Sequence, residues 1–230
     1  MPRSARAAAD HAAREGQRRR TVNDTLALVH VDDTLIVTDK PSGLLAVPGH
    51  GEQGRDCLAA RVQARYADAL VVHRLDQATS GLMLFARGAD AQRALSLAFA
   101  RREVDKRYVA VVAGAMHADE GTIELPLMRD WPNRPRQIVD FTQGKPSTTH
   151  WRVLHRDAST TRVELEPLTG RSHQLRVHLQ AIGHPIVGDA LYAPPEVQAM
   201  APRLLLHASA LAFTHPVSGE GLRFTSDVPF

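Results

Sequence analysis

The sequence has little cysteine and no long apolar stretch. Its 230 residues include one cysteine, Cys57, so neither a disulfide within the chain nor a cage of cysteine ligands can form. A lone cysteine is typical of a reducing compartment. Unbroken apolar runs, such as residues 82–86, are short beside the roughly 20 residues that span a bilayer. The first 20 residues lack the apolar centre of a secretory signal. We therefore expect a cytoplasmic protein without a membrane span.

Several signatures of familiar chemistry are also missing. No His-Glu-x-x-His motif occurs, and His173 and His178 are five residues apart, which does not place them on one helical face. There is no Gly-x-Ser-x-Gly elbow and no Walker loop. We expect no metal and no cofactor, and a metal-dependent hydrolase that uses His and Asp stays as a weaker alternative.

Positive charge is concentrated at the start of the chain. The whole sequence has a net charge of +3. Residues 1–20 hold six arginines and two acids, so the remaining residues sum to about −1. We predict a basic arm over residues 1–20, and contact with nucleic acid through local patches of the remainder. Arginine far outnumbers lysine. This can reflect codon usage, but arginine is also the better fork for phosphate.

The pattern of apolar residues predicts an α+β fold. Helical spacing appears at residues 55–69, 89–102 and 173–182, the last capped by Ser172 and ended by Gly183, with Leu175, Leu179 and Ile182 as its buried stripe. Runs of strand length are separated by turn residues, and they are residues 26–31, 35–38, 82–86, 107–112, 121–125, 137–141, 148–154, 161–165, 204–214 and 222–225. Several strands follow one another directly, which favours a mixed, mainly antiparallel sheet.

Three segments could carry chemistry. Asp76 lies in a loop, residues 73–81, directly before a strongly apolar strand, where a carboxylate can act as nucleophile or base. Tyr108 begins another strand. Arg171 and Arg176 flank the start of a helix, a good place for phosphate or a carboxylate. From the residues alone, Asp76 could instead cap a turn, Tyr108 could be a core tyrosine, and the arginines could be surface charges.

Together these segments resemble the RluA-type RNA pseudouridine synthases. The resemblance covers about residues 26–230, and its five motifs occur in the family's order. They are His73-Arg74-Leu75-Asp76 with Thr79-Ser80-Gly81, Lys106-x-Tyr108, Gly170-Arg171-Ser172-His173-Gln174-Leu175-Arg176-Val177-His178, Gly183-His184-Pro185-Ile186-Val187-Gly188-Asp189-x-x-Tyr192, and Leu205-Leu206-His207-Ala208. The resemblance implies isomerisation of uridine to pseudouridine in RNA by a mixed, mainly antiparallel sheet with a central active-site cleft flanked by helices and loops.

The resemblance also implies roles for individual residues. Asp76 matches the essential carboxylate, Tyr108 the active-site tyrosine, and Arg176 the basic residue that pairs with the aspartate. Arg74 matches the arginine that enters the space vacated by the flipped base, and His73 belongs to the same RNA-binding motif. From position and charge alone, we add four candidate phosphate contacts: Arg129, Arg134, Arg136 and Arg171.

Further segments narrow the resemblance. Asp130-Trp131-Pro132-Asn133-Arg134-Pro135, Gly144-Lys145-Pro146 and Met200-Ala201-Pro202-Arg203-Leu204-Leu205-Leu206-His207 resemble the dual-specificity members. These members modify position 746 of 23S rRNA and position 32 of certain tRNAs, so the resemblance implies both RNAs as partners. We expect a catalytic domain over residues 21–230, no S4-like RNA-binding domain, and a monomer. A non-catalytic RNA-binding module of the same fold is the alternative function.

Overall fold

Most of the predicted strands join in one large sheet. The computed structural model describes residues 26–49, 51 and 54–230. The arm predicted over residues 1–20 lies outside these residues. The strands are β1 (Leu28–Val31), β2 (Leu35–Lys40), β3 (Ala69–Val71), β4 (Ser80–Arg87), β5 (Asp105–Ala113), β6 (Glu120–Glu124), β7 (Leu127–Arg129), β8 (Gln137–Val139), β9 (Thr148–Arg156), β10 (Thr160–Pro167), β11 (Leu206–Thr214) and β12 (Gly221–Thr225). The helices are α2 (Leu58–Arg65), α3 (Ala89–Arg101), α4 (Gln174–Ala181) and α5 (Pro195–Gln198).

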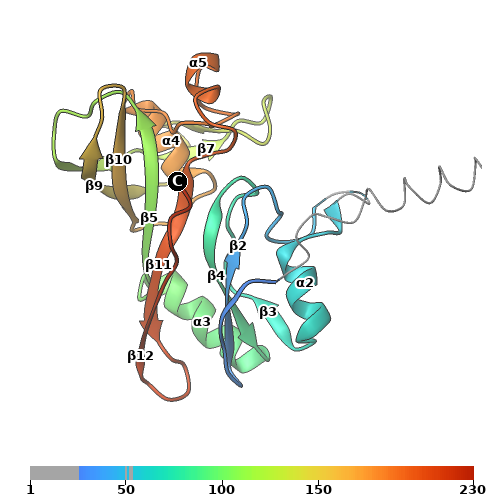
Figure 1. The fold of residues 1–230 in the computed structure, drawn as a ribbon. Coiled ribbons are helices and arrows are strands. Elements are labelled where there is room, and N and C mark those ends of the chain that lie inside the picture. Colours follow the sequence, from blue (N-terminus) through green and yellow to red (C-terminus); the bar gives the residue numbers. More distant parts are fainter. Residues whose placement is uncertain (1–25, 50, 52–53) are drawn as a thin grey trace, which may run out of the picture.

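The sheet is mixed and mainly antiparallel, so the predicted fold class is confirmed. Its order is β1-β2-β4-β11-β5-β10-β9-β6, with β3 added to β4 and β12 to β11, while β7 and β8 form a separate hairpin. Every pairing is antiparallel except that of β4 with β11. Figure 1 shows β2, β3 and β4 with α2 on one side of the molecule, and β5, β9 and β10 with α4 on the other.

The strand β4 is apolar throughout because both of its faces are covered. Leu82 and Leu84 pack in a cluster with Leu95 of α3, whereas Met83 and Phe85 pack in another with residues of α2. Alternate residues of a strand point to opposite faces, so the unbroken run at residues 82–86 belongs in a strand between two layers, as predicted. This burial makes β4 a rigid base for the loop that precedes it.

The parallel contact between β4 and β11 joins the two sides of the sheet. Ser80 lies opposite His207, and Gly81 lies opposite Ala208. Gly81 has a φ of +112°, and a Cβ there would lie 2.3 Å from the carbonyl oxygen of Ala208. Only glycine permits this approach. The loop that contains Asp76 therefore ends at the centre of the molecule.

The predicted boundaries of the last long helix were partly wrong. His173, not Ser172, is the residue before α4, with a φ of 55° and no side-chain capping bond. The side chain of Gln174 makes the hydrogen bond to the preceding loop instead, since its Oε1 accepts from the N–H of Arg171. Ile182 is 37% exposed rather than buried, because the helix ends before it. The end near Gly183 was predicted correctly.

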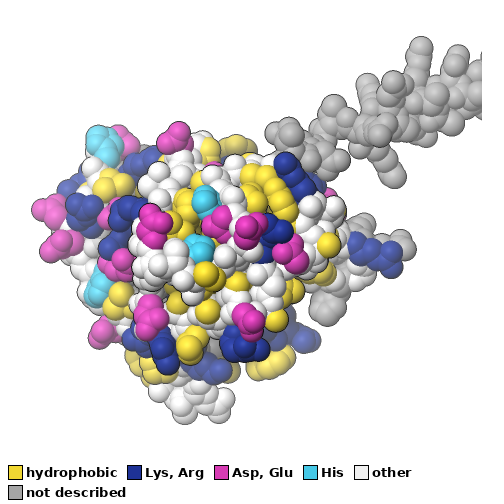
Figure 2. Space-filling view, turned by 90° about the horizontal axis from the view of Figure 1, so that it is seen from below, with side chains coloured by type: hydrophobic (Ala, Val, Ile, Leu, Met, Phe, Trp, Pro, Cys, Tyr) yellow, Lys and Arg dark blue, Asp and Glu magenta, His cyan; other side chains and the backbone are white. Residues whose placement is uncertain are grey.

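Two further observations bear on partners. No helix in the part of the chain that the structure describes is long and apolar enough to cross a membrane. On the face seen in Figure 2, acidic and basic side chains are interspersed. This agrees with the near-balance of charge beyond residue 20 in the sequence.

Candidate active site

A cavity of about 500 Å³ lies where the two sides of the sheet meet. Its walls come from the β3–β4 loop, the end of α3, the start of β5, and the β10–α4 loop with the first turn of α4. Five of its residues are Lys or Arg: Arg74, Arg102, Lys106, Arg171 and Arg176. Among the described residues that line it, Asp76 is the only carboxylic acid. The volume is within the range of small-molecule sites, and the charges suit an anionic substrate.

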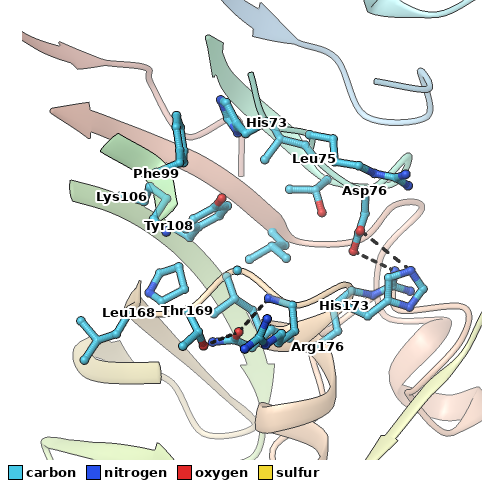
Figure 3. A pocket seen from close by; sticks show the side chains of 18 of the residues that line it. His73, Leu75, Asp76, Phe99, Lys106, Tyr108, Leu168, Thr169, His173 and Arg176 are labelled. Atoms are coloured by element: carbon cyan, nitrogen blue, oxygen red, sulfur yellow. Dashed lines mark hydrogen bonds and ion pairs between the residues drawn. The ribbon is translucent and has the colours of Figure 1, made fainter. Parts of the chain in front are cut away.

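Asp76 projects from the β3–β4 loop toward two residues of the opposite wall (Figure 3). Its Oδ2 lies 3.4 Å from Nη1 of Arg176, and its Oδ1 lies 3.8 Å from Nε2 of His173. The carboxylate is 20% exposed, so it is neither buried nor free. The structure thus brings together Asp76 and Arg176, which are 100 residues apart in the chain, as predicted.

Arg176 is held mainly by a carboxylate that received no role in the sequence analysis. Its Nε and Nη2 donate to the two carboxylate oxygens of Asp189, both at 2.7 Å. Arg176 is 4% exposed and Asp189 is fully buried. Burial acts to lower the pKa of Arg176, but the hydrogen bonds and charge of Asp189, with the charge of Asp76, raise it above its ordinary value. Arg176 therefore presents a permanent, oriented cation to Asp76, and its shorter bonds go to Asp189.

His173 lines the adjoining edge of the cavity and is bonded to Tyr192. Nδ1 of His173 lies 2.6 Å from the hydroxyl of Tyr192, which also accepts from the N–H of Gln137 at 2.8 Å. A tautomer in which Tyr192 donates to Nδ1 leaves the Nε2–H of His173 facing Asp76. Burial lowers the pKa of His173, which favours this neutral ring. Tyr192 thereby couples the β7–β8 hairpin to the site.

Tyr108 lies on β5 across the cavity from Asp76 (Figure 3). Tyr108 lines the cavity, and its ring packs against the core cluster beneath β5 and β10, so its position fits both interpretations and its role in the reaction stays a prediction. Burial, and then the charge of Asp76, raise the pKa of Tyr108 well above its usual value. The hydroxyl is therefore protonated at neutral pH, and the free protein offers an aromatic face rather than a phenolate base.

His73 has a structural partner in the wall. Its Nε2 accepts from the N–H of Leu84 in β4 at 2.9 Å. Its ring stacks on Phe99 with centroids 4.6 Å apart. Burial, and then the charge of Lys106, lower the pKa of His73 to about 3. The ring is thus neutral and fixed, and its predicted contact with RNA stays a prediction.

The remaining predicted arginines fall into two groups. Arg74 and Arg171 are exposed residues that line the cavity. The others, Arg129, Arg134 and Arg136, are not among its lining residues. They sit on the β7–β8 hairpin, because the loop between these strands carries them past Tyr192. A role for these three in phosphate contact stays a prediction.

The hairpin forms a stacked, exposed surface of its own. The guanidinium groups of Arg129 and Arg134 lie 5.1 and 5.5 Å from the ring centroid of Trp131. Trp131 is 58% exposed. An exposed aromatic ring with two guanidinium groups beside it can stack on a base and bind a phosphate. This arrangement could not be read from the sequence, where Trp131 has only its turn-like neighbours.

Three glycines between β2 and α2 match the spacing of a nucleotide-binding loop. Gly49, Gly51 and Gly54 have the Gly-x-Gly-x-x-Gly spacing of a dinucleotide loop. That loop needs a strand just before it and a helix just after it in a parallel βαβ unit. Here β2 precedes the glycines and pairs antiparallel with β4, and α2 begins only at Leu58. We assign no nucleotide site to this segment.

The ligand sets for metals give no candidate either. Within residues 26–49, 51 and 54–230, no group of three or more His, Cys, Asp or Glu side chains could hold a metal ion. His178, considered above with His173, is buried and bonds to Ser147 and Thr149. The two histidines therefore serve different neighbours.

Comparisons with known proteins agree with this geometry. A family model described as RNA pseudouridylate synthase matches residues 34–181. The dual-specificity RNA pseudouridine synthases RluA of Pasteurella multocida (strain Pm70) and Escherichia coli (strain K12) are each 50% identical over 206 residues, covering 89% of this chain and 94% of theirs. Human RNA pseudouridylate synthase domain containing 1 aligns with a TM-score of 0.76 at 29% identity, covering 91% of this chain and 86% of that chain. The human domain-containing 4 protein aligns at 0.72 and 24% identity, covering 88% of each chain, which shows likeness of fold.

Proposed function

The chain belongs to the RNA pseudouridylate synthase family and isomerises uridine to pseudouridine in RNA, and we propose that Asp76, Tyr108 and Arg176 carry this reaction. The observation that supports the assignment most directly is the placement of Asp76. It is the one acid among the described residues lining a cavity with five Lys or Arg side chains. An anionic strand is attracted to such a cavity, and a single carboxylate is left to act on the nucleotide.

The reaction breaks the bond between N1 of uracil and the sugar and forms a new bond from C5. A stacked base is out of reach, so the enzyme flips it into the cavity at a cost of a few kcal/mol. We assign Arg74, an exposed residue of the cavity, to the space that the base leaves. Its guanidinium can stack on the neighbouring bases and so offset part of that cost.

Asp76 starts the chemistry in its ionised form. Attack on the sugar, attack on the ring and removal of a sugar proton are all open to a carboxylate at this place. Arg176 stabilises the charged form and fixes its direction, since Asp189 holds the guanidinium from behind. The cation thus stays in place while Asp76 changes its bonding.

Tyr108 supplies the surface against which uracil stacks. An aromatic ring in offset contact with a base stabilises it without reading its identity. Since burial raises the pKa of Tyr108, its hydroxyl is a poor base in the free enzyme. Any part in removing the C5 proton therefore needs the bound substrate to change its surroundings.

The substrates follow from the relatives' dual specificity. Those 50% identical to this chain are named dual-specificity RNA pseudouridine synthases. We propose that this chain has two targets as well, position 746 of 23S rRNA and position 32 of tRNA. Arg171 in the cavity and Arg129, Arg134 and Arg136 on the hairpin contact their phosphates. We also propose that the enzyme is a cytoplasmic monomer.

The proposal is tested with RNA that carries tritium at C5 of uracil. A tRNA anticodon stem-loop and the matching 23S rRNA hairpin are incubated separately with the enzyme, because C5 tritium reaches water only when C5 is bonded anew. We expect release from both. Asp76→Asn should lower release by orders of magnitude while RNA binding stays near normal. Asp157→Asn, a change of the same kind at a 65% exposed carboxylate, is the matched control.

Each outcome has a distinct meaning. Release from one RNA keeps the reaction and removes dual specificity. Retained turnover in Asp76→Asn removes Asp76 from its role. Binding without release from any RNA supports the non-catalytic module instead. Full turnover in chelator is expected, and dependence on added metal would contradict the scheme.

A further inference from the structure

Two cations at one end of the cavity have no anionic partner. Arg102 follows α3 and Lys106 is the second residue of β5, and both line the cavity. No carboxylate in the described part of the chain lies within 4.0 Å of either side chain. The charges of Asp105 and Glu166 act on Lys106 from beyond that distance, and Glu166 is itself paired with Arg107. Burial lowers the pKa of Lys106 and the neighbouring charge of Arg102 lowers it further, so the two cations repel each other.

The backbone at Arg102 suits a different residue. Arg102 has a φ of 63°, in the left-handed region, where helices usually end on glycine. Its backbone N–H donates to the carbonyl oxygens of Ala98 and Phe99, and a glycine would make the same bonds. The helix end therefore does not need this side chain. Strained positions of this kind cluster at functional sites, and the other such non-glycine residue among those described, His173, also lines the cavity.

Lys106 is placed in line with the tyrosine of the site. Residues two apart on a strand point to the same face, and Lys106 and Tyr108 both face the cavity (Figure 3). Their separation along β5 is about 7 Å. When a base stacks on Tyr108, the RNA backbone that carries this base therefore lies within reach of Lys106.

Resting on the function proposed above, we propose that Arg102 and Lys106 together bind a phosphate group of the RNA strand, next to the target nucleotide. The phosphate supplies the nearby negative charge that no carboxylate gives to Arg102 or Lys106. It thereby reduces the repulsion between the two cations. Such a contact reads no sequence. It sets the depth to which the flipped nucleotide enters, because it fixes the backbone while Tyr108 receives the base.

The test uses Arg102→Gly and Lys106→Gln. Glycine fits the left-handed backbone, so Arg102→Gly should fold as well as the wild type or better. Arg101→Gln is the matched control, because it removes a neighbouring charge from a residue that does not line the cavity. Binding of the anticodon stem-loop and of an unrelated hairpin is measured over a range of salt concentrations. We expect roughly tenfold weaker binding of both RNAs by each variant, and a salt slope smaller by about 0.7.

A modified RNA locates the contact. An anticodon stem-loop with a neutral methylphosphonate beside the target uridine should bind the wild type as weakly as the natural RNA binds Arg102→Gly. The same replacement should cost Arg102→Gly nothing more. Unchanged affinity and salt slope in Arg102→Gly, or equal losses in Arg101→Gln, would overturn the proposal. Failure of the wild type to release tritium would instead contradict the proposed function, and the binding comparison is read independently of it.

Discussion

Asp189→Asn is the sharpest test of how the candidate site is held together. The carboxylate of Asp189 is fully buried and accepts two bonds of 2.7 Å from the guanidinium of Arg176. An amide in its place keeps one oxygen and turns an N–H₂ toward the Nε–H or the Nη2–H of Arg176. A donor then faces a donor, and the charge of Arg176 loses its buried counter-ion. Removing one partner of a buried pair costs about 3–5 kcal/mol.

We expect Asp189→Asn to lower the free energy of unfolding by about 3 kcal/mol, the lower end of that range, because one acceptor remains. The measurement is urea unfolding at neutral pH. Glu164→Gln is the control, since it breaks the exposed pair between Glu164 and Arg152. That change should stay within about 1 kcal/mol of the wild type.

Asp189→Asn should also reduce tritium release from RNA. With Asp189 neutral, Asp76 is the remaining carboxylate beside Arg176, now 3.4 Å away, and the guanidinium should turn toward it. Asp76 would then be bound too tightly to act on the nucleotide. If the variant unfolds within about 1 kcal/mol of the wild type and keeps its turnover, Asp189 does not orient Arg176 and the reasoning fails.

Two more predictions concern neutral groups in the cavity wall. His73→Ala removes the acceptor of the Leu84 N–H and the stack on Phe99, so it should lower stability by about 1–3 kcal/mol in urea. The pKa of His73 is lowered from 6.5 to about 3 in the folded protein. The contribution of His73 to stability is therefore complete above pH 6.5 and is lost as pH falls toward 3. The difference in free energy of unfolding between wild type and His73→Ala should shrink between pH 7 and pH 4. A constant difference would contradict the lowered pKa. Burial raises the pKa of Tyr108 from 10.0. Tyr108→Phe should therefore lower the rate of tritium release without changing the shape of the pH–rate profile below pH 10. A pH-dependent change of rate that occurs only in the wild type would show that the phenol ionises.

The sequence made Asp76 a candidate because its signal is local, and the family resemblance then gave it a role. A carboxylate in a turn-rich loop stands directly before the run at residues 82–86, whose strand length and continuous apolar character predict a strand covered on both faces. The helix α3 was predicted almost to its ends for the same reason, since its apolar residues repeat within a single segment. Local patterns are legible when neighbours in the chain decide the structure.

Asp189 could not be predicted as a partner of Arg176, because this contact is not local in the chain. Asp189 follows a helix, a turn and a short extended stretch, and only the three-dimensional path of that stretch brings its carboxylate to the guanidinium. The parallel contact of Ser80 with His207 is also between distant segments, 127 residues apart. The three-residue strand β3 is too short to show any period. The helix was predicted to begin at His173 with Ser172 as its cap, whereas it begins at Gln174, whose side chain makes the loop contact expected of Ser172.

Burial keeps several groups of the cavity neutral, whereas Arg176 stays charged despite its burial. It keeps the rings of His73 and His173 neutral and the phenol of Tyr108 protonated. The same burial would discharge a lone cation, yet Arg176 stays charged because Asp189 is buried with it. Over the pH range in which these groups keep their state, Arg176 presents a constant positive charge to Asp76, while His73, His173 and Tyr108 stay neutral. A change of turnover within that range should therefore not come from any of these four groups.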